Sequence, residues 1–184
     1  MAKQYAQIDP ALREFIEGQH VFFAASATPN SRVNVSPKGV NALSILDEKT
    51  VAYLDLTGSG SEAAAHLRAD GRLTLMFCAF EGRPQILRLY GRGRAVSRGS
   101  AEYGHLLDTA FAGIEPLGAR QIVILDIDLV QTSCGYGVPL FDYAGERPTL
   151  IDWAARKGEE GLEAYRREKN ARSIDGLPTG LFED

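Results

Sequence analysis

The sequence is poor in the residues that bind metals and form disulfides. It contains two cysteines and three histidines, and neither Cys78 nor Cys134 belongs to a CxxC or other metal-ligand spacing. The histidines are scattered along the chain as well. We therefore expect reduced thiols, as in a cytoplasmic protein, and no metal site.

Long apolar runs and a strong charge of either sign are also missing. No stretch approaches the roughly 20 apolar residues that cross a bilayer, and residues 1–18 lack the apolar core of a signal peptide. The net charge is −4, whereas a surface that binds nucleic acid is usually basic. We therefore expect a cytoplasmic protein that binds neither a membrane nor a nucleic acid.

What the chain does contain is a series of short segments with the alternating pattern of β-strands. They cover residues 20–27, 32–36, 42–46, 50–56, 73–80, 85–97 and 120–132. Short helices are predicted at residues 10–17, 61–69 and 101–112. Because most connections are short turns and strands do not alternate regularly with helices, the pattern predicts a mainly β fold with short helices, an antiparallel barrel of six or seven strands.

The last quarter of the chain has a different composition. A loop rich in glycine, proline and aromatic residues follows Cys134, and helices are predicted around Trp153 and over residues 159–172. We therefore divide the chain into a barrel domain, residues 1–135, and a C-terminal loop and helix extension, residues 136–184, packed on the same domain.

The stretch "RVNVSPKG" is the first candidate for a binding site. One face of this predicted strand carries the polar side chains of Arg32, Asn34 and Ser36. Val33 and Val35 are on the other face and are expected to pack inward, so the polar face meets either water or a ligand. Pro37 belongs at a strand end or edge. Together, Pro37 and Gly39 would fix the position of Lys38, which lies between them.

The stretch "TGSGSEAAAH" is the second candidate, because a strand leads through a Gly/Ser loop directly into a helix. Free N–H groups at a helix start favour a phosphate. The hydroxyls of Thr57, Ser59 and Ser61 add donors, and Gly58 allows close approach. Ser59 and Glu62 have the spacing of a capping box, so an ordinary helix cap is the competing interpretation.

Two further residues could contact a ligand. Arg88 lies between apolar neighbours in the segment "QILRLYGRGRAV" and needs an anion, a strong acceptor or access to water. Tyr136 lies between two glycines in "CGYGVP", where it could stack on a planar ligand or cover the core.

Together, these motifs resemble the pyridoxamine 5'-phosphate oxidase-like flavoproteins over roughly residues 15–135. The resemblance implies the FMN-binding split β-barrel and a homodimer with FMN at its interface, the barrel domain being the FMN-binding one. The strand and the Gly/Ser loop would contact the flavin and its phosphate, and the second subunit would supply Arg88 and Tyr136. The cofactor-binding residues implied are Arg32, Val33, Asn34, Val35, Ser36, Pro37, Lys38, Thr57, Gly58, Ser59, Ser61, Arg88 and Tyr136.

One difference between this sequence and the family bears on the reaction and not on the fold. True pyridoxamine phosphate oxidases have an Arg-Lys pair where this chain has Gly60-Ser61. We therefore expect an FMN-dependent oxidoreductase that transfers hydride between the flavin and a small organic substrate, and not a pyridoxamine phosphate oxidase. No catalytic residue can be identified from the sequence. An F420-dependent oxidoreductase and a non-catalytic flavin- or haem-binding carrier or sensor are the alternatives.

Overall fold

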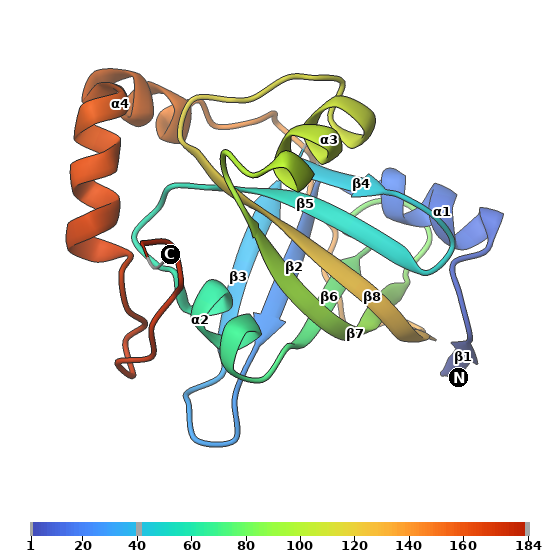
Figure 1. The fold of residues 1–184 in the computed structure, drawn as a ribbon. Coiled ribbons are helices and arrows are strands. Elements are labelled where there is room, and N and C mark those ends of the chain that lie inside the picture. Colours follow the sequence, from blue (N-terminus) through green and yellow to red (C-terminus); the bar gives the residue numbers. More distant parts are fainter. Residues whose placement is uncertain (1, 40–41, 183–184) are drawn as a thin grey trace.

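In the part of the chain that the structure describes, eight antiparallel strands form one sheet that curls around an apolar core (Figure 1). The computed structural model describes residues 2–39 and 42–182. The strands are β1 (Lys3–Tyr5), β2 (Val21–Ser26), β3 (Asn34–Gly39), β4 (Leu43–Ile45), β5 (Thr50–Leu56), β6 (Arg72–Cys78), β7 (Ile86–Ser97) and β8 (Ala119–Ser133). Their hydrogen-bonded order is β3-β2-β6-β7-β8-β5-β4, and β1 pairs with β8.

The predicted mainly β split barrel is confirmed, with one strand more than expected. That strand, β1, is too short to show a periodicity in the sequence. The helices are α1 (Pro10–Glu17), α2 (Glu62–Ala69), α3 (Ala101–Ala110) and α4 (Thr149–Lys169). Within α4, Gly158 has a φ of 65° and interrupts the helix, which agrees with two predicted helical segments. None of the helices in the described ranges is both long and apolar enough to cross a bilayer.

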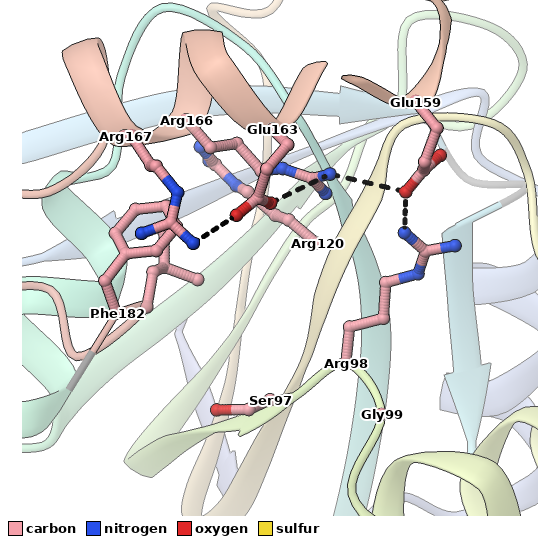
Figure 2. A pocket seen from close by; sticks show the side chains of 10 residues that line it. Ser97, Arg98, Gly99, Arg120, Glu159, Glu163, Arg166, Arg167 and Phe182 are labelled. Atoms are coloured by element: carbon pink, nitrogen blue, oxygen red, sulfur yellow. Dashed lines mark hydrogen bonds and ion pairs between the residues drawn. The ribbon is translucent and has the colours of Figure 1, made fainter. Parts of the chain in front are cut away.

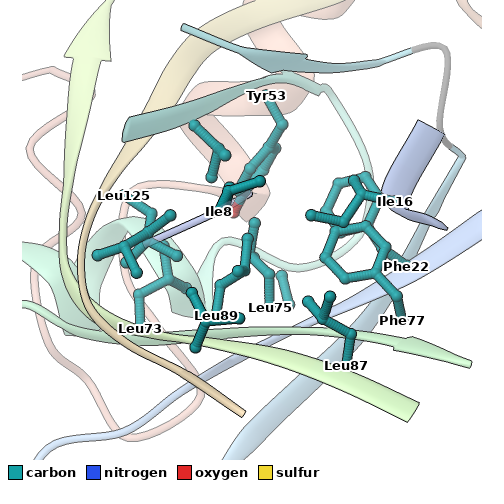
Figure 3. Packing of buried hydrophobic residues seen from close by; sticks show 14 of the residues in the cluster. Ile8, Ile16, Phe22, Tyr53, Leu73, Leu75, Phe77, Leu87, Leu89 and Leu125 are labelled. Atoms are coloured by element: carbon teal, nitrogen blue, oxygen red, sulfur yellow. The ribbon is translucent and has the colours of Figure 1, made fainter. Parts of the chain in front are cut away.

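The core fills the inside of the curled sheet (Figure 3). Its largest fully buried side chains include Phe22, Tyr53 and Phe77, which contribute aromatic contacts with ring centroids 5.6 and 5.7 Å apart. The long strands β7 and β8 cross this core, and their pairing shifts between Tyr90 and Gly91. A Cβ atom at Gly91 would lie 1.9 Å from the carbonyl oxygen of Asp126, so only glycine fits this close approach.

The C-terminal extension packs on the barrel through its second helical segment and the segment that follows (Figure 1). Leu162 and Arg166 are buried, and Arg166 donates a hydrogen bond to the carbonyl oxygen of Ala119 at the start of β8. The Thr179 hydroxyl donates to the carbonyl oxygen of Asn170. These contacts bring α4 next to the loop between β5 and α2.

Candidate functional site

The strand β3 presents its polar side chains inward, opposite to the orientation expected from the sequence. β2 pairs with β3 so that Asn34, Ser36 and Lys38 lie opposite Ser26, Ala24 and Phe22, which are buried. Val33 and Val35 instead point outward and are 71% and 58% exposed. The expectation that these valines pack inward is therefore wrong. Alternation alone fixes two faces, and the pairing with β2 decides which one is inside.

The inward polar groups of β3 are only half-buried. The side-chain amide of Asn34 donates to the hydroxyl of Ser36 over 3.3 Å. Pro37 belongs to β3 itself and lies opposite Phe23, which an edge strand tolerates because its other side has no ladder partner in the hydrogen-bonded order.

Arg32 precedes β3 and is paired with the C-terminal segment. Its side chain forms a salt bridge with Asp175, and its backbone N–H donates to the same carboxylate over 2.8 Å. These interactions hold the pKa of Asp175 below its usual value. The Arg32 side chain is nevertheless 74% exposed, so the predicted binding cation is accessible but already has an anionic partner.

Lys38 is paired with a buried carboxylate. Its Nζ lies 2.6 Å from Oδ1 of Asp55, near the end of β5. The other oxygen, Oδ2, accepts hydrogen bonds from Arg120 and Gln121 of β8, each over 2.8 Å. Burial alone would raise the pKa of Asp55, but Arg120 and Lys38 hold it well below its usual range. Lys38 therefore balances an internal charge, a role the sequence analysis did not assign to it.

The loop after β5 is fixed by hydrogen bonds to other parts of the chain. The hydroxyl of Thr57 donates to the carbonyl oxygen of Gly118 over 2.8 Å, so it is already used within the protein. The carbonyl of Gly58 accepts from the Asn170 side chain over 3.1 Å, and that of Gly60 accepts from Arg120 over 2.8 Å. The loop is thus anchored to β8 and to the end of α4.

The helix α2 begins without a side-chain cap. Its N-cap is Ser61, and no side chain there accepts a hydrogen bond from the helix backbone, so the capping box of Ser59 and Glu62, which was the competing interpretation of this loop, does not form. Glu62 instead accepts from the backbone N–H of Ile174 over 3.1 Å. The hydroxyl of Ser61 is buried and has no hydrogen-bond partner among the described residues. An orphaned buried hydroxyl is costly unless a ligand or water completes it.

The remaining two predicted residues lie apart from this loop. Arg88 on β7 is half-buried, lies opposite Met76 and Gln131, and donates to the hydroxyl of Ser133 over 3.2 Å. Tyr136 is 82% exposed.

Four residues that organise the site were not among those predicted from the sequence. They are Asp55, Arg120, Gln121 and Asn170. Charged residues inside the apolar segments "VAYLDL" and "RQIVILD" were a visible signal, because a buried charge requires a partner. Asn170 gave no comparable signal. In residues 2–39 and 42–182, no group of three or more His, Cys, Asp or Glu side chains could hold a metal ion.

Comparisons with known proteins agree with this architecture. The sequence model of the family described as pyridoxamine 5'-phosphate oxidase matches residues 8–134. A curated relative, the pyridoxamine 5'-phosphate oxidase family protein ustO of Aspergillus flavus, is 38% identical over an alignment 193 residues long, and the match covers 95% of this chain and 76% of that protein.

Solved structures share the fold at low sequence identity. The crystal structure of HupZ from Group A Streptococcus has a TM-score of 0.53 and 17% identity, and the match covers 66% of this chain and 91% of that chain. A Clostridium acetobutylicum protein of the pyridoxinephosphate oxidase family, related to general stress protein 26 of B. subtilis, has a TM-score of 0.51 and 15% identity, with 69% and 91% covered.

Proposed function

Because the chain belongs to the pyridoxamine 5'-phosphate oxidase family, we propose that it binds FMN and acts as an oxidoreductase on a small organic substrate. The observation that carries this proposal is the orphaned hydroxyl of Ser61 at the uncapped start of α2. A phosphate group would accept hydrogen bonds from that hydroxyl and from the free N–H groups of the first helical turn.

The loop that leads to α2 suits this role. Arg120 and Asn170 donate hydrogen bonds to the carbonyl oxygens of Gly60 and Gly58, respectively. Fixing the loop in advance reduces the entropy that a ligand must remove on binding. A side chain at Gly58 would meet only the carbonyl oxygen of Leu56, at 4.0 Å, so the backbone there is open to a ligand.

Arg32 would supply the positive charge for the phosphate. The phosphate would compete with the C-terminal segment for this region, because Asp175 forms a salt bridge with Arg32 and the backbone N–H of Ile174 donates a hydrogen bond to Glu62. We propose that this segment moves aside when the cofactor binds. Lys38 and Thr57 would act indirectly, since each already has a partner within the protein.

Bound FMN supplies hydride chemistry through its isoalloxazine ring, which the protein orients. The outward residues Val33, Val35 and Pro37 offer an apolar wall for that ring, because all three side chains are exposed. Arg88 lies in the same row of the sheet as Pro37, through Phe23 and Met76. This arrangement supports a flavin lying along the outer face of β3.

A homodimer is part of the proposal. Beside β3, the outward side chains of Phe23 and Met76 are only half-buried. Together with Val33 and Val35 they form an apolar face, and such a face is typical of an interface. In a second copy, the exposed Tyr136 would be available to close the flavin site.

The cofactor itself provides the test. Protein purified without added flavin should be yellow, and mass spectrometry of the cofactor released by heat should identify FMN. Reduction by NADH or NADPH should bleach the bound flavin and distinguish an enzyme from a carrier. Recovery of F420 or haem, or failure of added FMN to bind, would contradict the proposal.

A further inference from the structure

A cavity lies between the barrel and the C-terminal extension, and the proposed FMN site does not use it. Its volume is about 700 Å³, and Figure 2 shows the side chains that line it. Its walls come from the end of β7, the start of β8, the second half of α4 and the C-terminal segment. Four arginines line it, namely Arg98, Arg120, Arg166 and Arg167.

Two carboxylates, Glu159 and Glu163, line the cavity beside these four arginines. Glu159 pairs with both Arg98 and Arg166, and Glu163 pairs with both Arg166 and Arg167 (Figure 2). Behind the wall, Glu115 binds Arg98, while Asp55 is shared by Arg120 and Lys38. Four arginines therefore meet two carboxylates in the lining of the cavity, and the further carboxylates that pair with Arg98 and Arg120, Glu115 and Asp55, lie outside that lining.

Arg166 is the most constrained member of this group. Only 7% of its side chain is exposed. Its two terminal nitrogens have partners, one of them the carbonyl oxygen of Ala119 at 3.2 Å. Its Nε is buried and has no hydrogen-bond partner among the described residues. A buried guanidinium with an unused donor is costly, and a ligand acceptor would reduce that cost.

One wall of the cavity is apolar. Leu181 and Phe182 line it, and the guanidinium carbon of Arg167 lies 4.8 Å from the centre of the Phe182 ring. This wall would contact a hydrocarbon or aromatic group attached to the anion. Glu159 and Glu163 would repel a dianion such as phosphate more than a single carboxylate.

From these observations we propose that the cavity binds a small organic monocarboxylate whose apolar part packs against Phe182. The site differs from the proposed flavin site in its residues. All four of its arginines lie outside the loop and strand that would hold FMN, and two of these, Arg166 and Arg167, belong to the extension beyond residues 8–134. Arg120 connects the two regions, since it also holds the carbonyl of Gly60.

Titration calorimetry on the full-length protein tests this site with benzoate as the probe. Benzamide, which has the same shape without the charge, should bind far more weakly, and so should sulfate. Arg167→Gln should weaken benzoate binding about fivefold, because its charge-assisted hydrogen bonds are partly screened at 64% exposure. Glu163→Gln should strengthen it about threefold, since it removes a competing carboxylate.

Two further variants serve as matched controls. Arg13→Gln removes another exposed arginine that pairs with a glutamate four residues away, and it should leave benzoate binding unchanged. Arg32→Ala should also leave it unchanged, which separates this cavity from the proposed flavin site. The proposal is overturned if benzoate does not bind, if sulfate or benzamide binds as tightly, or if Arg167→Gln and Glu163→Gln behave like Arg13→Gln.

Discussion

Nε of Arg120 lies 2.8 Å from Oδ2 of Asp55, and both side chains are buried. This ion pair joins β5 and β8 at the point where β5 leads into the Gly/Ser loop. Arg120 also donates to the carbonyl oxygen of Gly60, so the same guanidinium neutralises a core carboxylate and fixes the loop proposed to bind phosphate. The pair therefore connects the stability of the barrel to the geometry of its candidate site.

Replacing Asp55 should destabilise the protein strongly and change its response to acid. Asp55→Asn leaves Arg120 and Lys38 without their shared anion, and breaking a buried ion pair costs about 3–5 kcal/mol. Urea denaturation at pH 7 measures this loss.

The pH dependence provides a second measurement on the same variant. The pKa of Asp55 is lowered by folding, so its stabilisation is complete above the unfolded pKa of about 4 and is lost as the pH falls further. The wild type should therefore lose stability more steeply than Asp55→Asn below about pH 4. Equal acid profiles would contradict the assigned role of this carboxylate.

Two serines at helix starts form a matched pair for testing the FMN site. Ser61→Ala should lower FMN affinity about tenfold, because a charge-assisted hydrogen bond is lost. Without FMN, this variant should be at least as stable as the wild type, because the hydroxyl that it removes is buried and has no partner among the residues that the structure describes.

Ser100→Ala should behave in the opposite way. The side chain of Ser100 accepts a hydrogen bond from the backbone of Tyr103 and caps α3. Its removal should cost about 1 kcal/mol and leave FMN affinity unchanged. Fluorescence titration with FMN and urea denaturation separate the two effects. Unchanged FMN affinity in Ser61→Ala would show that the Ser61 hydroxyl does not bind the cofactor and would contradict the FMN proposal at the point on which it depends.

Arg32 and Asp175 should have opposite effects on FMN binding. Arg32→Ala removes a cation from the proposed phosphate site and should weaken binding about tenfold, with little loss of stability because the side chain is exposed. Asp175→Ala removes the competing carboxylate and should strengthen binding. If both variants bind FMN like the wild type, Arg32 does not contact the cofactor.

Lys38 requires a different expectation. The resemblance implied that Lys38 binds the cofactor. Its ion pair with the buried Asp55 now predicts a clear loss of stability, because removing one partner leaves a charge uncompensated. Urea denaturation should show a larger loss for Lys38→Ala than for Arg32→Ala, and the reverse order would contradict this assignment.

The proposed dimer can be tested on the outer face of β3. Val35→Asp places a charge on the exposed apolar surface and should convert a dimer into a monomer with weakened FMN binding, as measured by light scattering and titration. Ile114→Asp is the control, because Ile114 is similarly exposed, at 69%, but lies in the loop that follows α3. A wild-type monomer that retains FMN would rule out a site shared between two subunits.

Pyridoxamine 5'-phosphate should not be a substrate. Its oxidation requires a second phosphate site, and a phosphate dianion usually needs cationic partners, whereas this chain has Gly60-Ser61 in the position of the family's Arg-Lys pair. We expect neither flavin bleaching nor formation of peroxide at saturating amine. Turnover on the order of 1 per second would show that the missing pair is dispensable.

Local patterns in the sequence determined the elements of this protein. Alternation in "HVFFAASA" and "RQIVILDIDLVQT" predicted β2 and β8, and the apolar spacing of residues 10–17 predicted α1, because periodicity depends on neighbouring residues only. The Gly/Ser loop before α2 was also visible as a candidate site. The order of these segments along the chain, together with the motifs, made the split barrel recognisable.

Contacts between distant residues could only be decided by the tertiary structure. Alternation in "RVNVS" defines two faces equally well whichever one is inside, and the register with β2 turned Asn34 and Ser36 inward. Asp55 and Arg120 are 65 residues apart, and Arg32 and Asp175 are 143 apart. The sequence shows that such charges need partners, but only the fold brings each one to its partner.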